Sequence, residues 1–239
     1  MNRERAYGIG FVAAVLIASG CTSIVKGPAE STGVPSAAGT QEAKDLKDDF
    51  EAGAVGNAPT GWSLARTGDG EGSDWKIAED NTAPKGSKVL AQTGESPRPT
   101  FNLCVADNTG FRDVEVSVAF KAVRGKMDQG GGVVWRYQDH NNYYVVRFNP
   151  LEDNYRLYKV VDGKRSQLAS KEELKAPAGN WHTLLVRMNG DEIVCLLDGT
   201  KHLEAKDGMF SKAGKVGLWT KADAQTCFDD FQARELTRR

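Results

Sequence analysis

Residues 130–163 read GGGVVWRYQDHNNYYVVRFNPLEDNYRLYKVVDG, and this stretch decides the fold class. Val133–Gln138 and Tyr143–Phe148 are rich in β-branched and aromatic residues, and the four residues between them, Asp139–Asn142, are of hairpin-forming types. A third strand is expected from Tyr155. The stretch therefore predicts three consecutive antiparallel strands in an all-β protein.

Side chains alternate across a strand, so the register of this hairpin separates two faces. With Gln138 opposite Tyr143, one face is continuous and apolar, and we expect it to be core. The other face mixes tyrosine, valine and arginine, whereas the outer face of a sandwich normally carries small polar and charged residues. Two interpretations stay open: amphipathic side chains that cover the sheet, or a face that binds a saccharide or an anion. The predicted core face holds Val133, Trp135, Tyr137, Tyr144, Val146 and Phe148, and the mixed face holds Val134, Arg136, Gln138, Tyr143, Val145, Arg147, Arg156, Tyr158 and Val160.

Short strands and turn signals continue on both sides of this stretch. Residues 113–121, DVEVSVAFK, alternate between apolar and other residues, and helical periodicity is absent. Asp162-Gly163, Asn189-Gly190 and Asp198-Gly199 predict tight hairpin turns, because these dipeptides favour positive φ. We therefore predict that residues 45–239 form one domain, a two-sheet antiparallel β-sandwich.

The first 44 residues differ in composition from the rest. Residues 1–20 carry two arginines and an apolar run shorter than the roughly 20 residues of a membrane span, which is typical of an export signal. Ala18-Ser19-Gly20-Cys21 resembles a bacterial lipobox, and this resemblance implies a lipidated Cys21; simple secretion and an uncleaved anchor are the alternatives. Residues 21–44 are predicted to form a flexible tether. Thr22 is not the aspartate associated with inner-membrane retention, so we expect a cell-envelope lipoprotein of the outer membrane, bound to the membrane through its lipid only.

Charge and cysteine content limit the remaining function classes. The formal net charge is −1 at pH 7, and this gives no basic excess for nucleic acid. Cys104, Cys195 and Cys227 lie in apolar or strand-like segments at spacings that do not suit zinc. In an oxidising compartment one pair could form a disulfide, and the sequence does not choose the pair.

The run GGVVWRYQDHNNYYVVRFNPLEDNYRLYKVVDGKR and the later run GKVGLWTKADAQTCFDDF resemble a known family. Both are similar to concanavalin A-like (laminin-G-like) jelly rolls of the 3-keto-disaccharide hydrolase-like family, and DDFE, PTGW and WKI near the start fit such domains. The resemblance covers about residues 45–235. It implies two curved antiparallel sheets with a concave face where saccharides bind. No catalytic motif of the family transfers to residues of this chain.

Glycosidase chemistry normally requires two carboxylic groups at a defined separation. The Glu-x-Asp-x-x-Glu motif of jelly-roll glucanases does not occur in the sequence. The candidate catalytic residues are therefore loop residues: His140, which could act as a general base near neutral pH, and Glu152 and Asp153. The alternative for each of them is a solvated turn residue.

Binding without catalysis depends on the mixed face. The predicted ligand-binding residues are Arg136, Tyr143, Arg147, Arg156 and Tyr158, which offer fork-shaped donors and flat apolar rings for a saccharide. No cofactor is predicted. The one metal interpretation is a structural calcium held by Asp49 and Asp229, with Asp48 and Asp230 as neighbours, if the terminal strands pair; the alternative is that these acids face water.

Three functions follow from these observations. The first is a lipid-anchored jelly-roll domain that binds carbohydrate. The second is a glycoside hydrolase acting on (3-keto) disaccharides or related glycans. The third is a structural or protein-interaction module of the cell envelope. The missing pair of carboxylates favours the first and third, whereas the family resemblance favours the second.

Overall fold

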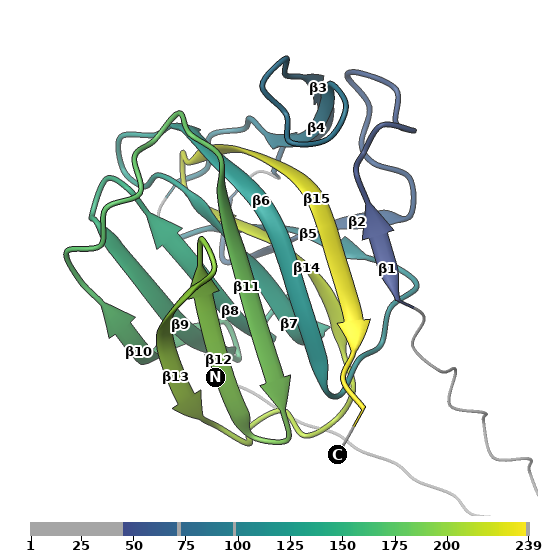
Figure 1. The fold of residues 1–239 in the computed structure, drawn as a ribbon. Helices are drawn as coiled ribbons and strands as arrows, with labels where there is room; N and C mark the ends of the chain where they lie inside the picture. Colours follow the sequence, from purple (N-terminus) through teal and green to yellow (C-terminus); the bar gives the residue numbers. More distant parts are fainter. Residues whose placement is uncertain (1–44, 71–72, 98, 238–239) are drawn as a thin grey trace, which may run out of the picture. The chain divides into compact units, whose positions relative to one another are not determined.

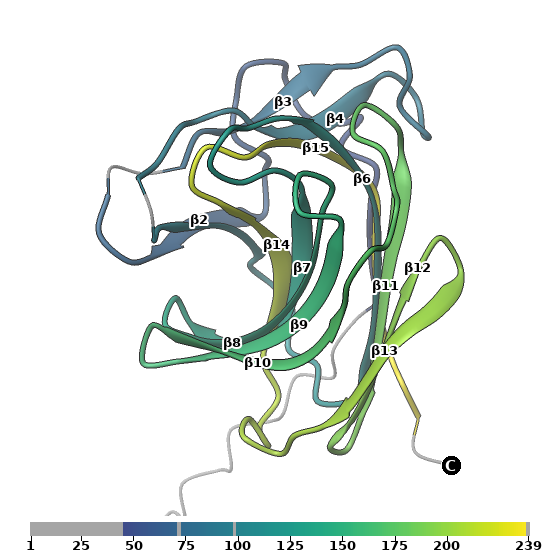
Figure 2. The same cartoon turned by 90° about the vertical axis from the view of Figure 1, so that its left-hand side faces the viewer.

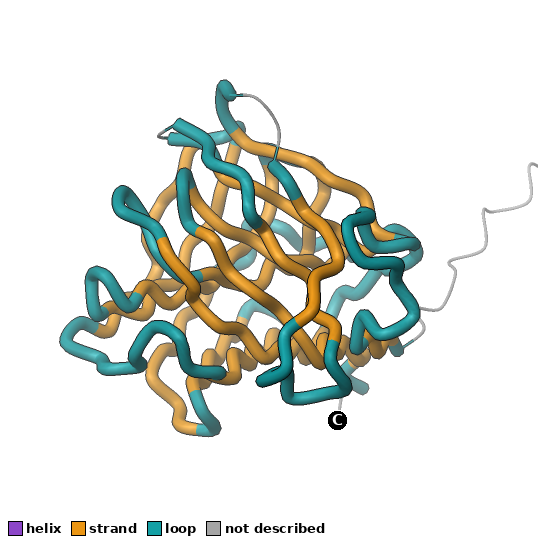
Figure 3. The backbone as a smooth tube through the Cα atoms, turned by 90° about the horizontal axis from the view of Figure 1, so that it is seen from above, coloured by secondary structure: helices purple, strands orange, loops and turns teal. Residues whose placement is uncertain are grey.

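The fold consists of strands and loops, with no helix among the residues that the structure describes (Figure 3). This structure is a computed structural model that describes residues 45–70, 73–97 and 99–237. The predicted signal peptide (residues 1–20) and the whole predicted tether (residues 21–44), with Cys21, lie outside these residues. Within them, no helix is long and apolar enough to span a membrane. The strands are β1 (Leu46–Asp48), β2 (Trp62–Thr67), β3 (Trp75–Glu79), β4 (Lys88–Gln92), β5 (Phe101–Ala106), β6 (Val114–Arg124), β7 (Gly131–Asp139), β8 (Asn142–Asn149), β9 (Asn154–Val161), β10 (Lys164–Lys171), β11 (His182–Asn189), β12 (Glu192–Leu197), β13 (Thr200–Lys206), β14 (Lys215–Lys221) and β15 (Gln225–Glu235).

The strands form two antiparallel sheets packed face to face (Figure 1). Sheet A has the order β13-β12-β11-β6-β15-β4-β3, and β1 also pairs with β15. Sheet B has the order β10-β9-β8-β7-β14-β5-β2. The predicted all-β, two-sheet antiparallel sandwich is thus confirmed.

The main core lies between the two sheets. On β6 the alternation of the sequence places Val114, Val116, Val118 and Phe120 inside, each at most 1% exposed. Sheet B contributes Trp135, Tyr144, Val146 and Phe148 to this core from β7 and β8. Because strand side chains alternate, every second residue of sheet B points away from sheet A.

Sheet B is curved, and the face that points away from sheet A is concave (Figure 2). The side chains on this concave face bury one another in a second apolar cluster. The cluster is formed by Phe101, Leu103, Val105, Val134, Tyr143, Val145, Tyr158, Val160 and Trp219. The concave face therefore has an apolar floor of its own.

The β7–β8 hairpin differs from its predicted form. Asp139 pairs with Asn142, so the turn is the two residues His140 and Asn141, and the register shifts between Trp135 and Asp139. Arg136, at a φ of 45°, lies in this bulge. The predicted four-residue loop was wrong, because a bulge in β7 takes up the additional residues.

The bulge also reverses the predicted orientations of two neighbouring residues, Arg136 and Tyr137. Arg136 is 2% exposed, and its guanidinium donates to the carbonyl oxygens of Arg112 (2.7 Å), Phe210 (2.7 Å) and Gly190 (2.6 Å) and to Asp113 (3.3 Å). Tyr137 instead packs against the concave cluster and stacks on Tyr143. The prediction that Arg136 lies on the mixed face is therefore wrong; this arginine joins loops at the end of the sandwich.

Candidate functional site

The candidate site is a set of charged side chains on the concave face of sheet B. Arg147 of β8 pairs directly with Arg156 of β9, and Val145 pairs with Tyr158 in the same way. Directly paired residues in an antiparallel ladder point to the same face. The pairing places Arg147, Arg156 and Tyr158 side by side on one face, as the sequence predicted.

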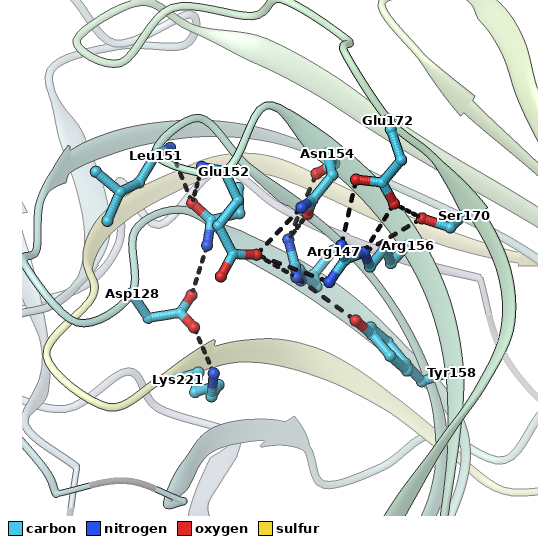
Figure 4. Close-up of polar contacts among 11 residues, drawn as sticks. Asp128, Arg147, Leu151, Glu152, Asn154, Arg156, Tyr158, Ser170, Glu172 and Lys221 are labelled. Carbon is cyan, nitrogen blue, oxygen red and sulfur yellow. Dashed lines mark hydrogen bonds and ion pairs between the residues drawn. The ribbon is translucent and has the colours of Figure 1, made fainter.

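Arg147 is fixed by polar groups from the β8–β9 turn (Figure 4). The side chain is 2% exposed. Its Nη1 donates to the side-chain oxygen of Asn154, and its Nη2 donates to Glu152 Oε2 at 2.9 Å. Nη2 also lies 3.5 Å from the Tyr158 hydroxyl oxygen. The buried positive charge therefore has both a carboxylate and neutral acceptors.

Arg156 is more accessible than Arg147. Its side chain is 28% exposed, and its Nε and Nη2 each donate to Glu172 at 3.2 Å. Nε is also 3.2 Å from the Ser170 hydroxyl, which itself bonds to Glu172. Arg156 Nη1 lies 3.9 Å from Glu152 Oε2. Arg156 can therefore present donors to a bound molecule while its carbon chain rests on the sheet.

A second ion pair adjoins this network. Asp128 is 2% exposed and lies 2.7 Å from Lys221 Nζ of β14. The side-chain amide of Asn149 donates to the other oxygen of Asp128 at 3.1 Å, and its side-chain oxygen Oδ1 accepts the backbone N–H of Leu151 at 2.9 Å. Asn149 thereby connects Asp128 to the turn that carries Glu152.

Glu152 is held as an anion. Burial would raise the pKa of this carboxyl, but the charge of Arg147, hydrogen bonds from Asn154 and Arg147, and the charge of Arg156 together lower it below its usual value. A general acid for glycosidic cleavage needs a raised pKa. Glu152 is therefore suited to accepting hydrogen bonds and is poorly suited to donating a proton.

The tyrosines predicted to bind ligand lie on the expected face but are not open rings. Tyr143 is 0% exposed and Tyr158 is 4% exposed. Thr67 Oγ1 of β2, the strand at the other edge of the curved sheet B, lies 2.8 Å from the Tyr143 hydroxyl, and the Arg165 guanidinium carbon lies 4.2 Å from the centre of the Tyr158 ring. The expectation that these rings serve as exposed stacking surfaces was wrong, because both side chains are buried.

The three predicted catalytic residues do not converge. His140 and Glu152 lie beyond opposite ends of the eight-residue strand β8, which corresponds to roughly 25 Å of extended chain. The Asp153 carboxylate forms an ion pair with Lys175. His140 lines a separate open cleft of about 700 Å³. The remaining lining of this cleft is Leu64, Ala65, Arg66, Gly68, Asp69, Asn141, Asp162, Gly163 and Lys164.

The predicted metal ligands have other partners. β1 pairs with β15, so the terminal strands are neighbours as the calcium interpretation required. Asp229 accepts the backbone N–H groups of Lys85 (2.8 Å) and Asp230 (2.6 Å), and Asp49 accepts that of Glu51 (3.3 Å). Within residues 45–70, 73–97 and 99–237, no group of three or more His, Cys, Asp or Glu side chains could hold a metal ion. The acids at these strand ends act as turn acceptors.

The three cysteine side chains within the described residues form no disulfide. Cys104 and Cys195 are each 0% exposed, Cys227 is partly exposed, and all three are free thiols. Burial raises the pKa of Cys227 to about 11. These residues behave as small apolar side chains of the sandwich.

Sequence reasoning missed several members of the site. Arg165 lies opposite Val160, so it also points to the concave face, where its guanidinium stands 4.2 Å from the centre of the Tyr158 ring. The Asp162-Gly163 turn was a usable signal, because a two-residue turn fixes the pairing of the next strand. Lys221 had no comparable signal, since β14 and β7 are far apart in the sequence.

Comparison with known proteins identifies the family. The chain belongs to the 3-keto-alpha-glucoside-1,2-lyase-like domain family, which matches residues 46–234. The predicted family is thus confirmed, and the fold is a concanavalin A-like jelly roll. No sequence among curated proteins matches this chain significantly.

Solved structures with the same fold include proteins named for carbohydrates. The carbohydrate binding module CBM66 from Bacillus subtilis is 20% identical, with a TM-score of 0.57 over 73% of this chain and 96% of that chain. The Bacillus licheniformis beta-glucanase is 13% identical, with a TM-score of 0.56 over 82% and 100%. The cellulose induced protein Cip1 is 14% identical, with a TM-score of 0.58 over 81% and 100%. At these identities the likeness establishes the fold alone.

Proposed function

We propose that this chain is an exported, lipid-anchored jelly-roll domain that binds carbohydrate at the cell envelope through the concave face of sheet B. The observation that carries the proposal is the partly exposed network of Arg156, Glu152 and Glu172 on that face. Fixed donors and acceptors at this spacing suit the hydroxyl groups of a sugar, and the buried network behind them limits the entropy lost on binding. The family and the carbohydrate binding module among the structural relatives support the same ligand class.

The anchor is proposed from the sequence, with Cys21 as the lipidated residue and residues 21–44 as the tether. Labelling cells with a radioactive fatty acid tests it. The full chain should carry the label, and Cys21→Ala should abolish the labelling and release the protein from membranes. Retention of label in that variant would overturn the anchor without affecting the binding proposal.

Binding is tested on a glycan array and by calorimetry with residues 45–239. Arg156→Gln should weaken binding at least tenfold, because the variant loses the charged fork that faces solvent. The matched control is Arg187→Gln, a half-exposed arginine that pairs with Glu115 on sheet A. Arg147 is a poor probe, because it is buried and its loss disturbs the fold. Absence of binding to every glycan would overturn the proposal and favour a protein partner.

The second candidate function is cleavage of (3-keto) disaccharides or related glycans. One observation favours it: the Asn149 side chain joins the Asp128 carboxylate to the backbone N–H of Glu152, so two acidic residues lie in neighbouring positions on this face. The lowered pKa of Glu152 and the ion pair of Asp128 with Lys221 argue against an acid–base pair for hydrolysis. A turnover screen on plain and 3-keto disaccharides tests whether the protein cleaves them. Product that disappears in both Asp128→Asn and Glu152→Gln would establish an enzyme.

A further inference from the structure

Arg165 differs from the other cations of the concave face. Its guanidinium carbon lies 4.2 Å from the ring centre of Tyr158, 5.1 Å from that of Phe101 and 6.0 Å from that of Trp219. Aromatic faces attract a cation but provide no hydrogen-bond acceptor in the guanidinium plane. The residue as a whole is partly exposed, whereas its Nη1 is buried.

Three other cations of this face each have a carboxylate partner. Arg147 pairs with Glu152, Arg156 with Glu172, and Lys221 with Asp128. Among the described residues Arg165 has no ion pair, and its Nη1 is buried without an acceptor. The carboxylate that acts on it at longer range is that of Asp128, already bonded to Lys221. Of these four cations, Arg165 is the one without a carboxylate partner among the described residues.

A second buried donor on the same face also lacks an acceptor. Arg147 Nε makes no hydrogen bond within the described part of the chain, although this side chain is 2% exposed. Burial of Arg165 lowers its pKa, which is the direction expected for a cation that has lost water without gaining a counter-ion. An anion brought to this face would supply the missing charge.

We propose that the concave face prefers acidic saccharides, with the carboxylate of a uronic acid residue bound by Arg165. This inference rests on the proposed carbohydrate-binding function. A guanidinium matches a carboxylate through two parallel hydrogen bonds, and because Nη1 is buried, Nε and Nη2 are the donors for them. The Tyr158 ring, 4.2 Å from the guanidinium carbon, supports the group. A sulfate ester on a sugar shares the negative charge, so the test separates the two groups.

The experiment measures the affinity of residues 45–239 for uronate oligosaccharides built from galacturonate, glucuronate or mannuronate. Each is compared with its methyl ester, which has the same sugar and linkage without the charge, and with a sulfated galactan oligosaccharide. At least one uronate should bind tenfold or more tightly than its ester. This preference should decrease as salt concentration rises, because it depends on charge.

Variants assign the preference to one side chain. Arg165→Gln should bring acid and ester to equal affinity, whereas Lys164→Gln, the same charge change at the exposed neighbouring residue, should leave the preference intact. Arg165→Lys serves as a second variant if the glutamine variant fails to fold. It keeps the charge without the fork, and it should lose most of the preference.

Three results would overturn the inference. The first is that acids and esters bind with equal affinity and that Arg156→Gln weakens both. This result would support the carbohydrate-binding function and refute the preference for acids. Tight binding of the sulfated oligosaccharide alone would contradict the carboxylate assignment. Failure of every saccharide to bind would overturn both proposals.

Discussion

Arg147 and Arg156 are directly paired across β8 and β9, and one carboxylate oxygen, Glu152 Oε2, lies 2.9 Å from the first guanidinium and 3.9 Å from the second. Like charges at directly opposed positions destabilise a ladder. Glu152 offsets that repulsion from the turn between the two strands. The pairing of β8 with β9 and the charge pattern of the concave face therefore depend on the same residue.

Glu152→Gln should destabilise the domain by about 1 to 3 kcal/mol, because Arg147 then stays buried without a counter-charge. Urea unfolding followed by tryptophan fluorescence measures the change. The control is Glu172→Gln, which removes the more exposed partner of Arg156 and should leave the midpoint nearly unchanged. Equal midpoints for both variants and the parent would refute this role of Glu152.

Arg136→Met should destabilise the domain by roughly 3 to 5 kcal/mol, because three backbone carbonyl groups lose a charged donor at once. Thermal unfolding by differential scanning calorimetry measures the loss. Arg112→Met is the matched control, since that side chain is exposed in the neighbouring loop. An unfolding temperature close to that of the control would show that Arg136 is dispensable to the sandwich.

Gly132→Ala should destabilise the protein by about 3 kcal/mol through overpacking. A Cβ at this position would lie 2.1 Å from the Val146 carbonyl oxygen and 2.9 Å from Arg147 Cβ, so β7 would have to move away from β8. Gly110→Ala is the control, because no atom lies within 4 Å of its added Cβ. Unfolding in guanidinium distinguishes the two variants, and identical curves would contradict the close approach of the strands.

The stability of the domain should depend on Asp229 between about pH 4 and 6. Burial, only partly offset by hydrogen bonds from the Lys85 and Asp230 amides, raises the pKa of Asp229 from 3.8 to about 6. The folded state therefore binds this proton more tightly than the unfolded state, so the contribution of Asp229 is full below about pH 4 and is lost as pH rises through 6. Its maximal slope is about 1.4 kcal/mol per pH unit.

Asp229→Asn removes the titrating carboxyl, so the variant should not lose this stability as pH rises. Relative to the parent, the free energy of unfolding of the variant should increase between pH 4 and 6, as measured by urea titrations at several pH values. Asp230→Asn is the control at the adjacent, more accessible position. Parallel pH profiles for parent and Asp229→Asn would rule out this titration.

Alternation along the strands was sufficient to predict most of the sandwich and half of the site. It placed Val146 in the core and Arg147 on the opposite face, because a one-residue slip would have reversed both. It failed at Arg136, because the bulge depends on carbonyl acceptors from loops distant in the sequence. The burial of Tyr143 was equally out of reach, since it follows from the curvature that brings Thr67 of β2 to its hydroxyl.

The ion pair of Arg147 with Glu152 could not be predicted from the sequence, for a different reason. Glu152 was recognised as a turn acid, and nothing local distinguishes a solvated turn acid from one that folds back on its own strand. The side chain of Asn149 fixes the conformation of the turn that carries Glu152, because its oxygen accepts the backbone N–H groups of Leu151 and Glu152. Such side-chain capping of a turn is a recurrent role of asparagine and could have been considered.

The position of β15 in sheet A has a consequence for synthesis on the ribosome. This last strand of the described chain pairs with β1, β4 and β6, all formed by residues made much earlier. Until it emerges, these three strands expose unpaired backbone edges, and contacts so distant in sequence form slowly. The nascent domain therefore completes sheet A only after its final strand is available, and until then its strand edges are open to pairing with other chains.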